Sequence, residues 1–149
     1  MVIYPDTSFL VSLYIDEEPT HLAKLYMQTT ASPLPFTPFH RLEFRTALRM
    51  RAFRKKLTIA DLQLALRKSD EDLLDNILLH TPMNWSDTLR EAERLGEAHL
   101  TETGVRSGDL LHVASAVVLG AREFVTFDQR QTKLARRAGL KVKAWKLAK

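Results

Sequence analysis

Short apolar runs alternate with longer amphipathic stretches along this chain. The apolar runs have the length of β-strands and are bounded by proline, glycine or charged residues, so they predict buried strands. The amphipathic stretches repeat apolar positions every three or four residues, which predicts helices. The predicted strands cover residues 2–4, 34–37, 123–127 and 140–144. The predicted helices cover residues 7–15, 20–30, 39–55, 58 to about 79, 86 to about 100, 108–119 and 129–138.

Residues typical of helix ends support these boundaries. Thr58 opens a segment that resembles a capping box, with aspartate in the position usual for glutamate. We expect Ser86 and Ser107 to cap the two helices that follow them. Gly120 and Gly139 follow apolar helical stretches and predict their ends.

The order of the elements predicts the fold class. Strands separated by helices are typical of a parallel sheet with helices packed on both faces. We therefore expect an α/β protein, a doubly wound α/β/α sandwich with a central, mainly parallel sheet. The sequence has no internal repeat and no long linker, so residues 1–149 are predicted to form a single domain.

The composition excludes several classes of protein. The chain of 149 residues has no cysteine, which rules out disulfide frameworks, thiol nucleophiles and zinc–thiolate sites. Its longest nearly apolar run, residues 110–121, is too short to cross a bilayer, and its first residues lack the features of a secretory signal. We expect a cytoplasmic protein without a membrane span. The formal net charge of +4 favours a polyanionic partner.

Acidic residues fall where a parallel fold binds its ligands. Asp6 and Asp128 each follow a predicted strand. Ligands of such folds lie beyond the carboxyl ends of the strands, so the two carboxylates meet if their strands are neighbours. Asp109 lies in the first turn of its predicted helix, where the helix dipole favours a carboxylate.

A fourth acid, Glu43, is the one that a structural role explains least well. It shares a helix face with Phe39, Ala47 and Met50, and we expect that face to point at the core. A carboxylate there is costly unless it is paired or binds a metal. Four acids brought together would repel one another, and a divalent cation relieves that repulsion. Oxygen ligands suit Mg²⁺ or Mn²⁺, so the favoured chemistry is hydrolysis of phosphodiester bonds by metal-activated water.

Ordinary structural roles also explain several of these residues one at a time. Asp6 and Asp128 can cap the helices that follow them, and Asp109 can be a simple first-turn acid. His40 and His112 each lie one helical turn from a candidate acid. Packing or a backbone hydrogen bond explains the two histidines better than a role beside a metal.

Four segments form motifs in a fixed order along the chain. They are Asp6-Thr7-Ser8-Phe9-Leu10, His40-Arg41-Leu42-Glu43, the segment from Arg106 to Ala116, and the segment from Val125 to Gln131 with the later Gly139-Leu140-Lys141-Val142. Together they resemble the motifs of the PIN-domain ribonucleases, in particular the VapC-like toxins of toxin–antitoxin pairs. The resemblance covers essentially the whole chain, and its third and fourth motifs are the most specific.

The resemblance implies a metal-dependent endoribonuclease, the toxin of a type II toxin–antitoxin system. It implies an RNA substrate, an antitoxin that covers the active site, a homodimer, and bound Mg²⁺ or Mn²⁺. The implied catalytic and metal-binding residues are Asp6, Glu43, Asp109 and Asp128, supported by Thr7 or Ser8 and by Thr126. Ser107 and Gly108 stand where some relatives carry an extra acid, so one-metal and two-metal mechanisms both stay open.

Basic residues gather in two stretches without acids, one from Arg45 to Lys56 and one from Gln129 to Lys149. Such runs are usually solvated helix faces, but beside a phosphodiesterase site they neutralise substrate phosphates. We assign Arg45 and Arg49 to the RNA and leave the role of the C-terminal stretch open. Apolar residues around helix 39–55, with helix 58–79, offer a groove for an antitoxin segment.

Other functions remain as alternatives. The main one is a PIN-type RNA-binding module of RNA processing with little or no catalysis, and the presence of all four acids favours the enzyme instead. An aspartyl phosphatase usually needs a second acid at the position of Ser8. No glycine-rich run ends in Gly-Lys-Ser or Gly-Lys-Thr, which disfavours a P-loop enzyme.

Overall fold

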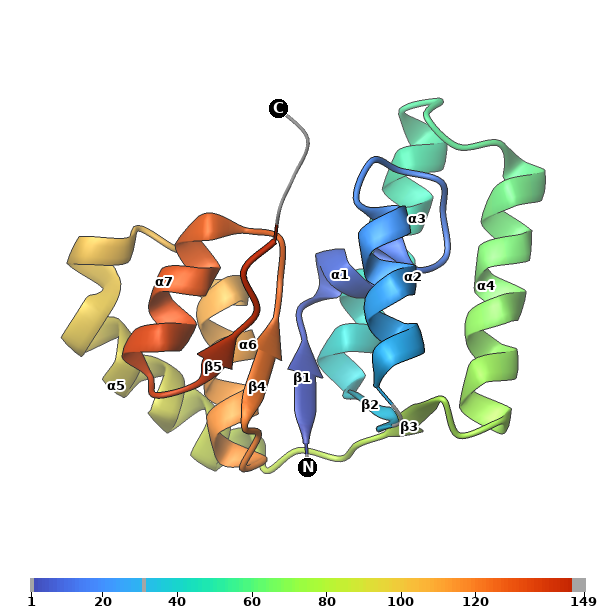
Figure 1. The fold of residues 1–149 in the computed structure, drawn as a ribbon. Helices are drawn as coiled ribbons and strands as arrows, with labels where there is room; N and C mark the ends of the chain where they lie inside the picture. The colour runs from blue at the N-terminus through green and yellow to red at the C-terminus, as the bar shows by residue number, and fades with distance from the viewer. Residues whose placement is uncertain (1, 31, 146–149) are drawn as a thin grey trace. The chain divides into compact units, whose positions relative to one another are not determined.

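The computed structural model describes residues 2–30 and 32–145 (Figure 1). The chain forms two compact units. Unit 1 contains the residues up to Asp6 and those from Pro82 onward, and unit 2 contains Thr7–Thr81.

Unit 1 is built on a three-stranded parallel sheet. Its strands are β1 (Ile3–Pro5), β4 (Glu123–Val125) and β5 (Lys141–Val142), in the order β1-β4-β5. Tyr4 pairs with Phe124 in the register of β1 and β4. All three residues of β1 are buried, as expected for a parallel strand covered on both faces.

Three helices pack beside this sheet: α5 (Trp85–Thr103), α6 (Ser107–Val118) and α7 (Gln129–Arg137) (Figure 1). The core lies between them and the strands. Its largest fully buried side chains are Tyr4, Phe124, Leu95 and Leu134. The rings of Tyr4 and Phe124 stack with centroids 5.7 Å apart, which helps to fix β1 against β4.

Unit 2 contains a two-stranded parallel sheet and four helices. The strands are β2 (Leu34–Phe36) and β3 (Leu78–His80). The helices are α1 (Thr7–Ser12), α2 (Thr20–Thr29), α3 (Pro38–Phe53) and α4 (Ile59–Leu74), with α4 at one edge of the unit (Figure 1). Phe44 and Leu48 of α3, with Leu34 of β2, are among its buried residues.

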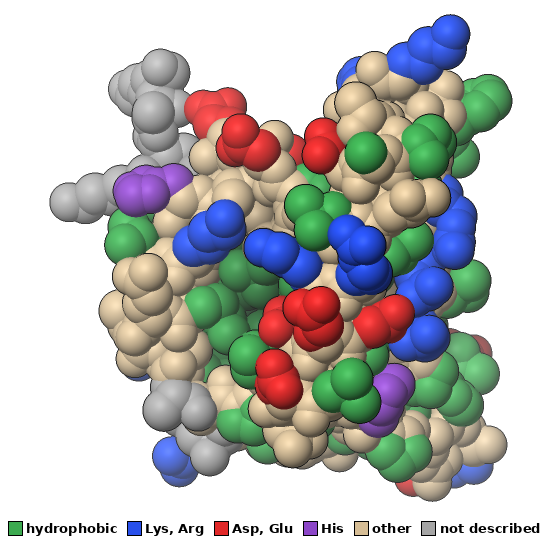
Figure 2. Space-filling model, turned by 90° about the vertical axis from the view of Figure 1, so that its right-hand side faces the viewer, with side chains coloured by type: hydrophobic (Ala, Val, Ile, Leu, Met, Phe, Trp, Pro, Cys, Tyr) green, Lys and Arg blue, Asp and Glu red, His purple; other side chains and the backbone are tan. Residues whose placement is uncertain are grey.

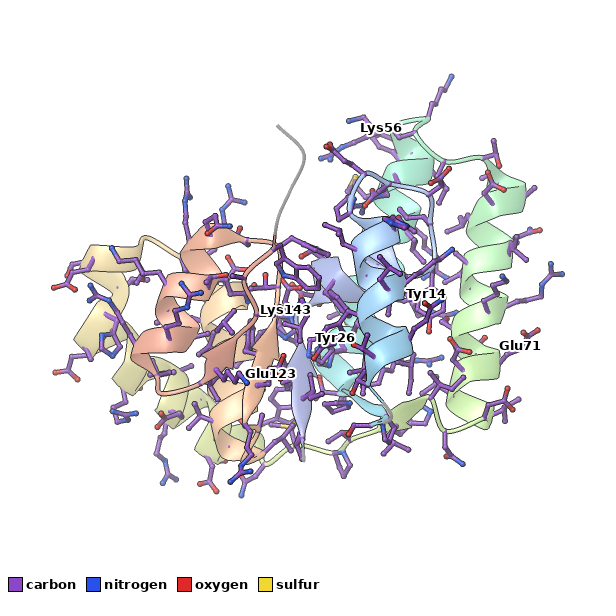
Figure 3. All side chains as sticks on the ribbon, in the orientation of Figure 1. Tyr14, Tyr26, Lys56, Glu71, Glu123 and Lys143 are labelled. Carbon is purple, nitrogen blue, oxygen red and sulfur yellow. The ribbon has the colours of Figure 1, made fainter. Side chains whose placement is uncertain are left out.

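The loop after α1 is attached to α3 and α4 by polar contacts. The Tyr14 hydroxyl donates to Asp72 Oδ2 on α4 at 2.5 Å (Figure 3). Burial, together with this carboxylate, raises the pKa of Tyr14 well above its usual range. Arg51 of α3 donates from Nε to Glu17 Oε1 at 2.7 Å. These bonds hold an irregular segment in place against two regular helices.

The ends of the helices confirm some of the expected caps and correct others. Thr58 accepts from the Asp61 amide at 3.1 Å, as predicted. Gly120 and Gly139 have φ angles of 70° and 88°, which glycine adopts readily, and both follow helix ends as predicted. The cap expected at Ser86 is wrong, because the Asn84 side chain accepts from the amide of Asp87 and α5 begins at Trp85.

The expected cap at Ser107 is also wrong. Ser107 is the first residue of α6, and Arg106 precedes it in extended conformation. The helical turn therefore starts one residue earlier than the serine suggested. The boundary moves by one position, and Asp109 stays in the first turn.

The largest error concerns the end of α4. The sequence pattern extended this helix to about residue 79, but it ends at Leu74, and Leu78–His80 forms β3 beside β2. Asn76 adopts a φ of 57°, a left-handed conformation that asparagine tolerates and that ends a helix. Within β3 only Leu78 is buried, so the burial of this strand does not follow its apolar residues.

Parallel strands that alternate with helices confirm the predicted α/β class. The strand pairing forms a three-stranded and a two-stranded sheet, so the strands predicted at 34–37 and 123–127 pair in different sheets. Over residues 2–30 and 32–145, no helix is long and apolar enough to span a membrane.

Candidate active site

Asp6 lies directly after β1, at the carboxyl end of the three-stranded sheet. Its amide donates to the main-chain oxygen of Val125 at 3.0 Å, which continues the pairing of β1 with β4. The side chain is only 4% exposed, and its Oδ2 accepts a hydrogen bond from Thr126 Oγ1 at 2.6 Å. A short bond from a hydroxyl to a buried carboxylate is among the stronger neutral-to-charged hydrogen bonds. Asp6 is therefore held in one orientation.

Thr126 connects two of the candidate acids. It follows β4 and is completely buried. Its hydroxyl donates to Asp6 and accepts from the backbone amide of Asp128 at 3.0 Å. The side chain thus joins the end of β1 to the turn that carries Asp128. The supporting role of Thr126 at a metal site stays a prediction.

Asp128 caps α7. Its Oδ1 accepts from the backbone amide of Gln131 at 2.9 Å, and its main-chain oxygen accepts from the Thr132 hydroxyl at 2.9 Å. The capping role that the sequence left open is therefore real. Asp128 is exposed, in contrast to the buried Asp6.

Asp109 lies in the first turn of α6 and is half-buried. Its main-chain oxygen accepts a hydrogen bond from Gln131 Nε2 at 3.3 Å. The free amides and the dipole at the start of α6 favour a charged side chain in this position. Gln131 therefore ties the start of α6 to the network around Thr126.

A buried side-chain pair connects β1 to α6. The Tyr4 hydroxyl and His112 Nδ1 share a hydrogen bond of 2.7 Å, and both side chains are buried. Tyr4 lies two residues before Asp6 on β1, and His112 lies one turn after Asp109 on α6. The bond fixes the strand against the helix. His112 is therefore buried in the packing as predicted, but this hydrogen bond is to a side chain rather than to the backbone.

His40 also has the expected backbone role. It closes a capping box at the start of α3, because its amide donates to Thr37 Oγ1 at 3.1 Å and the Thr37 amide donates to His40 Nδ1 at 3.0 Å. Its ring stacks on Phe36 with centroids 6.1 Å apart.

Glu43 belongs to unit 2, on α3. Its Oε1 accepts from the Thr7 hydroxyl at 2.7 Å, and Thr7 is the residue that follows Asp6 in the sequence. Ser8 is exposed. The supporting role expected for Thr7 or Ser8 stays a prediction.

The predicted environment of Glu43 needs correction. The buried stripe of α3 is formed by His40, Phe44 and Leu48, at spacings of four residues. Glu43 flanks this stripe and is half-buried, and Met50, expected on the core face, is 41% exposed. Phe39 and Phe44 lie on different faces of this helix, so the sequence pattern did not decide which face is buried. The cost of burying Glu43 is therefore smaller than the sequence suggested.

The sequence of the chain matches the PIN domain over residues 3–137. The chain belongs to the PIN-domain family. PIN domains are a family of nucleases, so the predicted family and its general nuclease class are confirmed. No curated protein matches the chain significantly.

Solved structures with the PIN fold resemble the whole chain. VapBC2 from Rickettsia felis, bound to a DNA fragment from its promoter, matches with a TM-score of 0.67 and 16% identity, over 98% of this chain and 100% of the other. VapBC-1 from nontypeable Haemophilus influenzae matches with a TM-score of 0.61 and 17% identity, over 97% and 98%. FitAcB from Neisseria gonorrhoeae matches with a TM-score of 0.61 and 13% identity, over 95% and 96%. These matches confirm the predicted fold.

Two residues of this PIN domain's network were missed by sequence analysis. Gln131 is fully buried and bonds to Thr126, Asp128 and Asp109. The sequence signal for Gln131 is a polar residue at an otherwise apolar position of α7, three residues after the capping Asp128. Trp145 donates from Nε1 to the main-chain oxygen of Thr126 at 2.9 Å.

Trp145 also organises the segment after β5. Its ring packs on Phe127 with centroids 4.7 Å apart, and Lys143 Nζ lies 5.3 Å from the centre of the indole (Figure 3). Lys143 of the basic C-terminal stretch therefore has a local cation–π partner. Lys146 and Lys149 of the same stretch lie outside the described residues.

The two arginines assigned to RNA lie on α3. Arg45 Nη1 is 3.7 Å from Asp70 Oδ1 on α4, and Arg49 is exposed. On the face of the molecule toward α4, basic side chains lie next to a group of acidic ones (Figure 2). This face is therefore mixed in charge rather than uniformly basic.

The structure brings the predicted acids together only in part. In unit 1, Thr126 and Gln131 connect Asp6, Asp128 and the backbone of Asp109. Glu43 lies in unit 2. Among residues 2–30 and 32–145, no group of three or more His, Cys, Asp or Glu side chains is gathered closely enough to hold a metal ion. The joint four-acid site therefore stays a prediction.

Proposed function

We propose that this PIN domain is a metal-dependent endoribonuclease. The observation that carries the proposal is the buried carboxylate of Asp6, fixed at the carboxyl end of β1 by a 2.6 Å bond from Thr126. The same hydroxyl accepts from the amide of Asp128. An oriented acid at the end of a parallel strand, inside a nuclease family, supports a catalytic role better than a capping role.

The donor chemistry of these residues fits a hard divalent cation. The side chains of Asp6, Asp109, Asp128 and Glu43 offer only oxygen atoms, which suit Mg²⁺ or Mn²⁺. His112 and His40, the nearest histidines in sequence, use Nδ1 in hydrogen bonds to other groups. When bound, the cation polarises a phosphoryl oxygen and lowers the pKa of water.

The chain's own residues prepare the site. Thr126 holds Asp6 in one rotamer when no cation is bound, so the carboxylate is oriented in advance of binding. Thr7 does the same for Glu43 through a 2.7 Å bond. The capping bond of Asp128 to Gln131 uses Oδ1 and orients the carboxylate from the start of α7. Three of the four proposed ligands, Asp6, Glu43 and Asp128, therefore have a side-chain hydrogen bond that limits their motion.

RNA is the proposed substrate, and Arg45 and Arg49 are its proposed phosphate contacts. Arg45 faces a competing carboxylate, because Asp70 lies 3.7 Å from its guanidinium. At this distance and exposure the ion pair is weak, so a phosphate can replace it. We therefore expect the contribution of both arginines to decrease as ionic strength rises.

Regulation by a protein antitoxin and assembly into a homodimer complete the proposal. The support is the fold that this chain shares with VapBC2, VapBC-1 and FitAcB. Exposed apolar residues on α3, Leu42 at 65% and Phe53 at 81%, offer contact area for a partner.

Light scattering after size-exclusion chromatography tests the dimer, and a strict monomer at micromolar concentration contradicts it. Coexpression with the product of the adjacent gene tests the antitoxin, and the absence of both complex formation and inhibition contradicts the toxin role.

Metal dependence is tested on labelled single-stranded RNA and on DNA of the same sequence. We expect the purified protein to cut RNA with Mg²⁺ or Mn²⁺, to stop with EDTA, and to recover when excess cation is added. Undiminished cleavage after complete chelation contradicts the mechanism. A gel shift of RNA without cleavage at any cation concentration supports the alternative, a binding module with little or no catalysis.

A further inference from the structure

Gln131 is a polar side chain buried in the middle of the candidate site. It lies in the first turn of α7 and is completely inaccessible to solvent. Its Nε2 donates to the main-chain oxygen of Asp109 at 3.3 Å, and its Oε1 lies 3.1 Å from Thr126 Oγ1. One amide group thus contacts the start of α6 and the end of β4.

The bond to Asp109 decides which end of the amide faces Thr126. A glutamine amide has donors at one end and an acceptor at the other. The main-chain oxygen of Asp109 only accepts, so it requires Nε2 on its side. Turning the amide over would place Oε1 against that oxygen, two acceptors in contact. Oε1 is therefore directed at the Thr126 hydroxyl.

The Thr126 hydroxyl has one proton and two acceptors within reach. Its oxygen accepts from the amide of Asp128 at 3.0 Å. Its proton can go to Asp6 Oδ2 at 2.6 Å or to Gln131 Oε1 at 3.1 Å, but not to both. The shorter bond to a carboxylate is the stronger one, so Asp6 receives the proton when nothing else is bound to it.

We propose that Gln131 is a positioning residue whose Oε1 is the second acceptor for the Thr126 proton, so that Thr126 can release Asp6 Oδ2 to a divalent cation. The inference rests on the proposed function, because it assigns Asp6 to the cation. Rotation about the hydroxyl C–O bond moves only a proton, and no heavy atom of the buried network shifts. Thr126 keeps a hydrogen bond in either state, so freeing Asp6 does not leave a buried hydroxyl unsatisfied.

Mn²⁺ binding to the RNA-free protein tests the proposal, with unbound Mn²⁺ quantified by electron paramagnetic resonance. Gln131→Met removes both ends of the amide at similar volume. Gln129→Met makes the same change at an exposed position of the same helix and is the matched control. We expect the Kd for Mn²⁺ to rise about tenfold or more in Gln131→Met. It should stay within about twofold of the wild type in Gln129→Met.

A conservative variant separates the acceptor from packing. Gln131→Glu has the same shape and keeps an acceptor for the Thr126 proton, although it loses the donor to Asp109. We expect it to bind Mn²⁺ at least as tightly as the wild type even if its Tm falls. A loss of affinity equal to that of Gln131→Met contradicts the proposal. This variant also provides the test if Gln131→Met does not fold.

A double-mutant cycle with Thr126→Val tests the route. Without the hydroxyl there is no proton for Gln131 to receive, so Gln131→Met should weaken Mn²⁺ binding less in the valine background than in the wild type. An equal loss in both backgrounds overturns the proposal, as does a folded Gln131→Met protein with wild-type affinity. If the wild type itself binds no Mn²⁺, the proposed function fails. If the wild type binds Mn²⁺ but Gln131→Met causes an equal loss in both backgrounds, this inference alone fails.

Discussion

Replacing Thr126 by valine removes one hydroxyl from the centre of the network and keeps the shape of the side chain. The hydroxyl makes a 2.6 Å bond to the buried carboxylate of Asp6 and accepts from the amide of Asp128 at 3.0 Å. Thr126 is fully buried, so water cannot take the place of the lost group without entering the core. Thr126→Ser is the matched control, since it keeps the hydroxyl and loses only a methyl group.

The magnitude follows from these two bonds. A hydrogen bond to a charged group contributes about 1.5–3 kcal/mol, and an amide left without its partner near the surface costs about another 1 kcal/mol. We therefore expect Thr126→Val to lower the free energy of unfolding by about 2.5–4 kcal/mol. For a chain of this length each kcal/mol corresponds to roughly 2–4 °C in Tm, so the expected decrease is about 5–16 °C. Thr126→Ser loses about 1 kcal/mol for its methyl group.

The assay combines thermal unfolding in EDTA with RNA cleavage at saturating Mg²⁺, at a temperature where every variant is folded. Thr126→Val should lose most of its cleavage rate, because Asp6 is no longer held, while Thr126→Ser should keep most of it. Equal stability and equal activity of the two variants would refute the argument that this hydroxyl orients Asp6.

Three further predictions concern charge and pH. Asp6→Asn keeps an acceptor for Thr126 but makes the bond neutral, so in EDTA its Tm should fall less than that of Thr126→Val; an equal decrease contradicts this. The raised pKa of Tyr14 means that its stabilising contribution is complete below pH of about 10 and is lost above it, so the Tm advantage over Tyr14→Phe should shrink between pH 8 and pH 11. The hydrogen bond and charge of Arg94 lower the pKa of Glu91. The small Tm difference between the wild type and Glu91→Gln should therefore be present at neutral pH and disappear as the pH falls below about 4, which thermal melts at neutral and at acidic pH would measure.

The strand that carries Asp6 could be predicted because its signals are local. A short apolar run that ends at Pro5 gives the strand, and the acid that follows must lie at its carboxyl end. The same argument gives β4 and Thr126. No local signal shows that β1 and β4 are neighbours. Their pairing in the parallel sheet is what brings Thr126 to Asp6.

The errors arose where burial did not follow the apolar pattern. Leu79 is 38% exposed although it looks like a core position, so the sequence did not distinguish strand β3 from a longer helix. On α3, apolar residues occur on more than one side, and Phe53 is 81% exposed. The elements that pack against α3 in unit 2 decide which of its faces is buried. The periodicity of α3 alone carries no information about those elements.

Residues that act through buried hydrogen bonds were the hardest to find. Gln131 and Trp145 both bond to Thr126 from positions later in the chain. Gln131 ends the fourth motif but is not one of its acids, and Trp145 lies outside the four motifs. A glutamine or a tryptophan in a helix or near a strand end is usually explained by packing or solvent exposure. Their partners become evident only when the three-dimensional contacts are known.

Cleavage of one labelled RNA by acid variants tests the central claim most directly, because it asks whether these carboxylates carry the reaction. Asp6→Asn, Glu43→Gln, Asp109→Asn and Asp128→Asn are compared with Glu97→Gln, an exposed acid on α5, all purified in the same way and shown to be folded. The account predicts that each of the four loses at least about tenfold in cleavage rate with Mg²⁺, while Glu97→Gln cleaves like the wild type. A folded Asp6→Asn protein that cleaves RNA at the wild-type rate would contradict it.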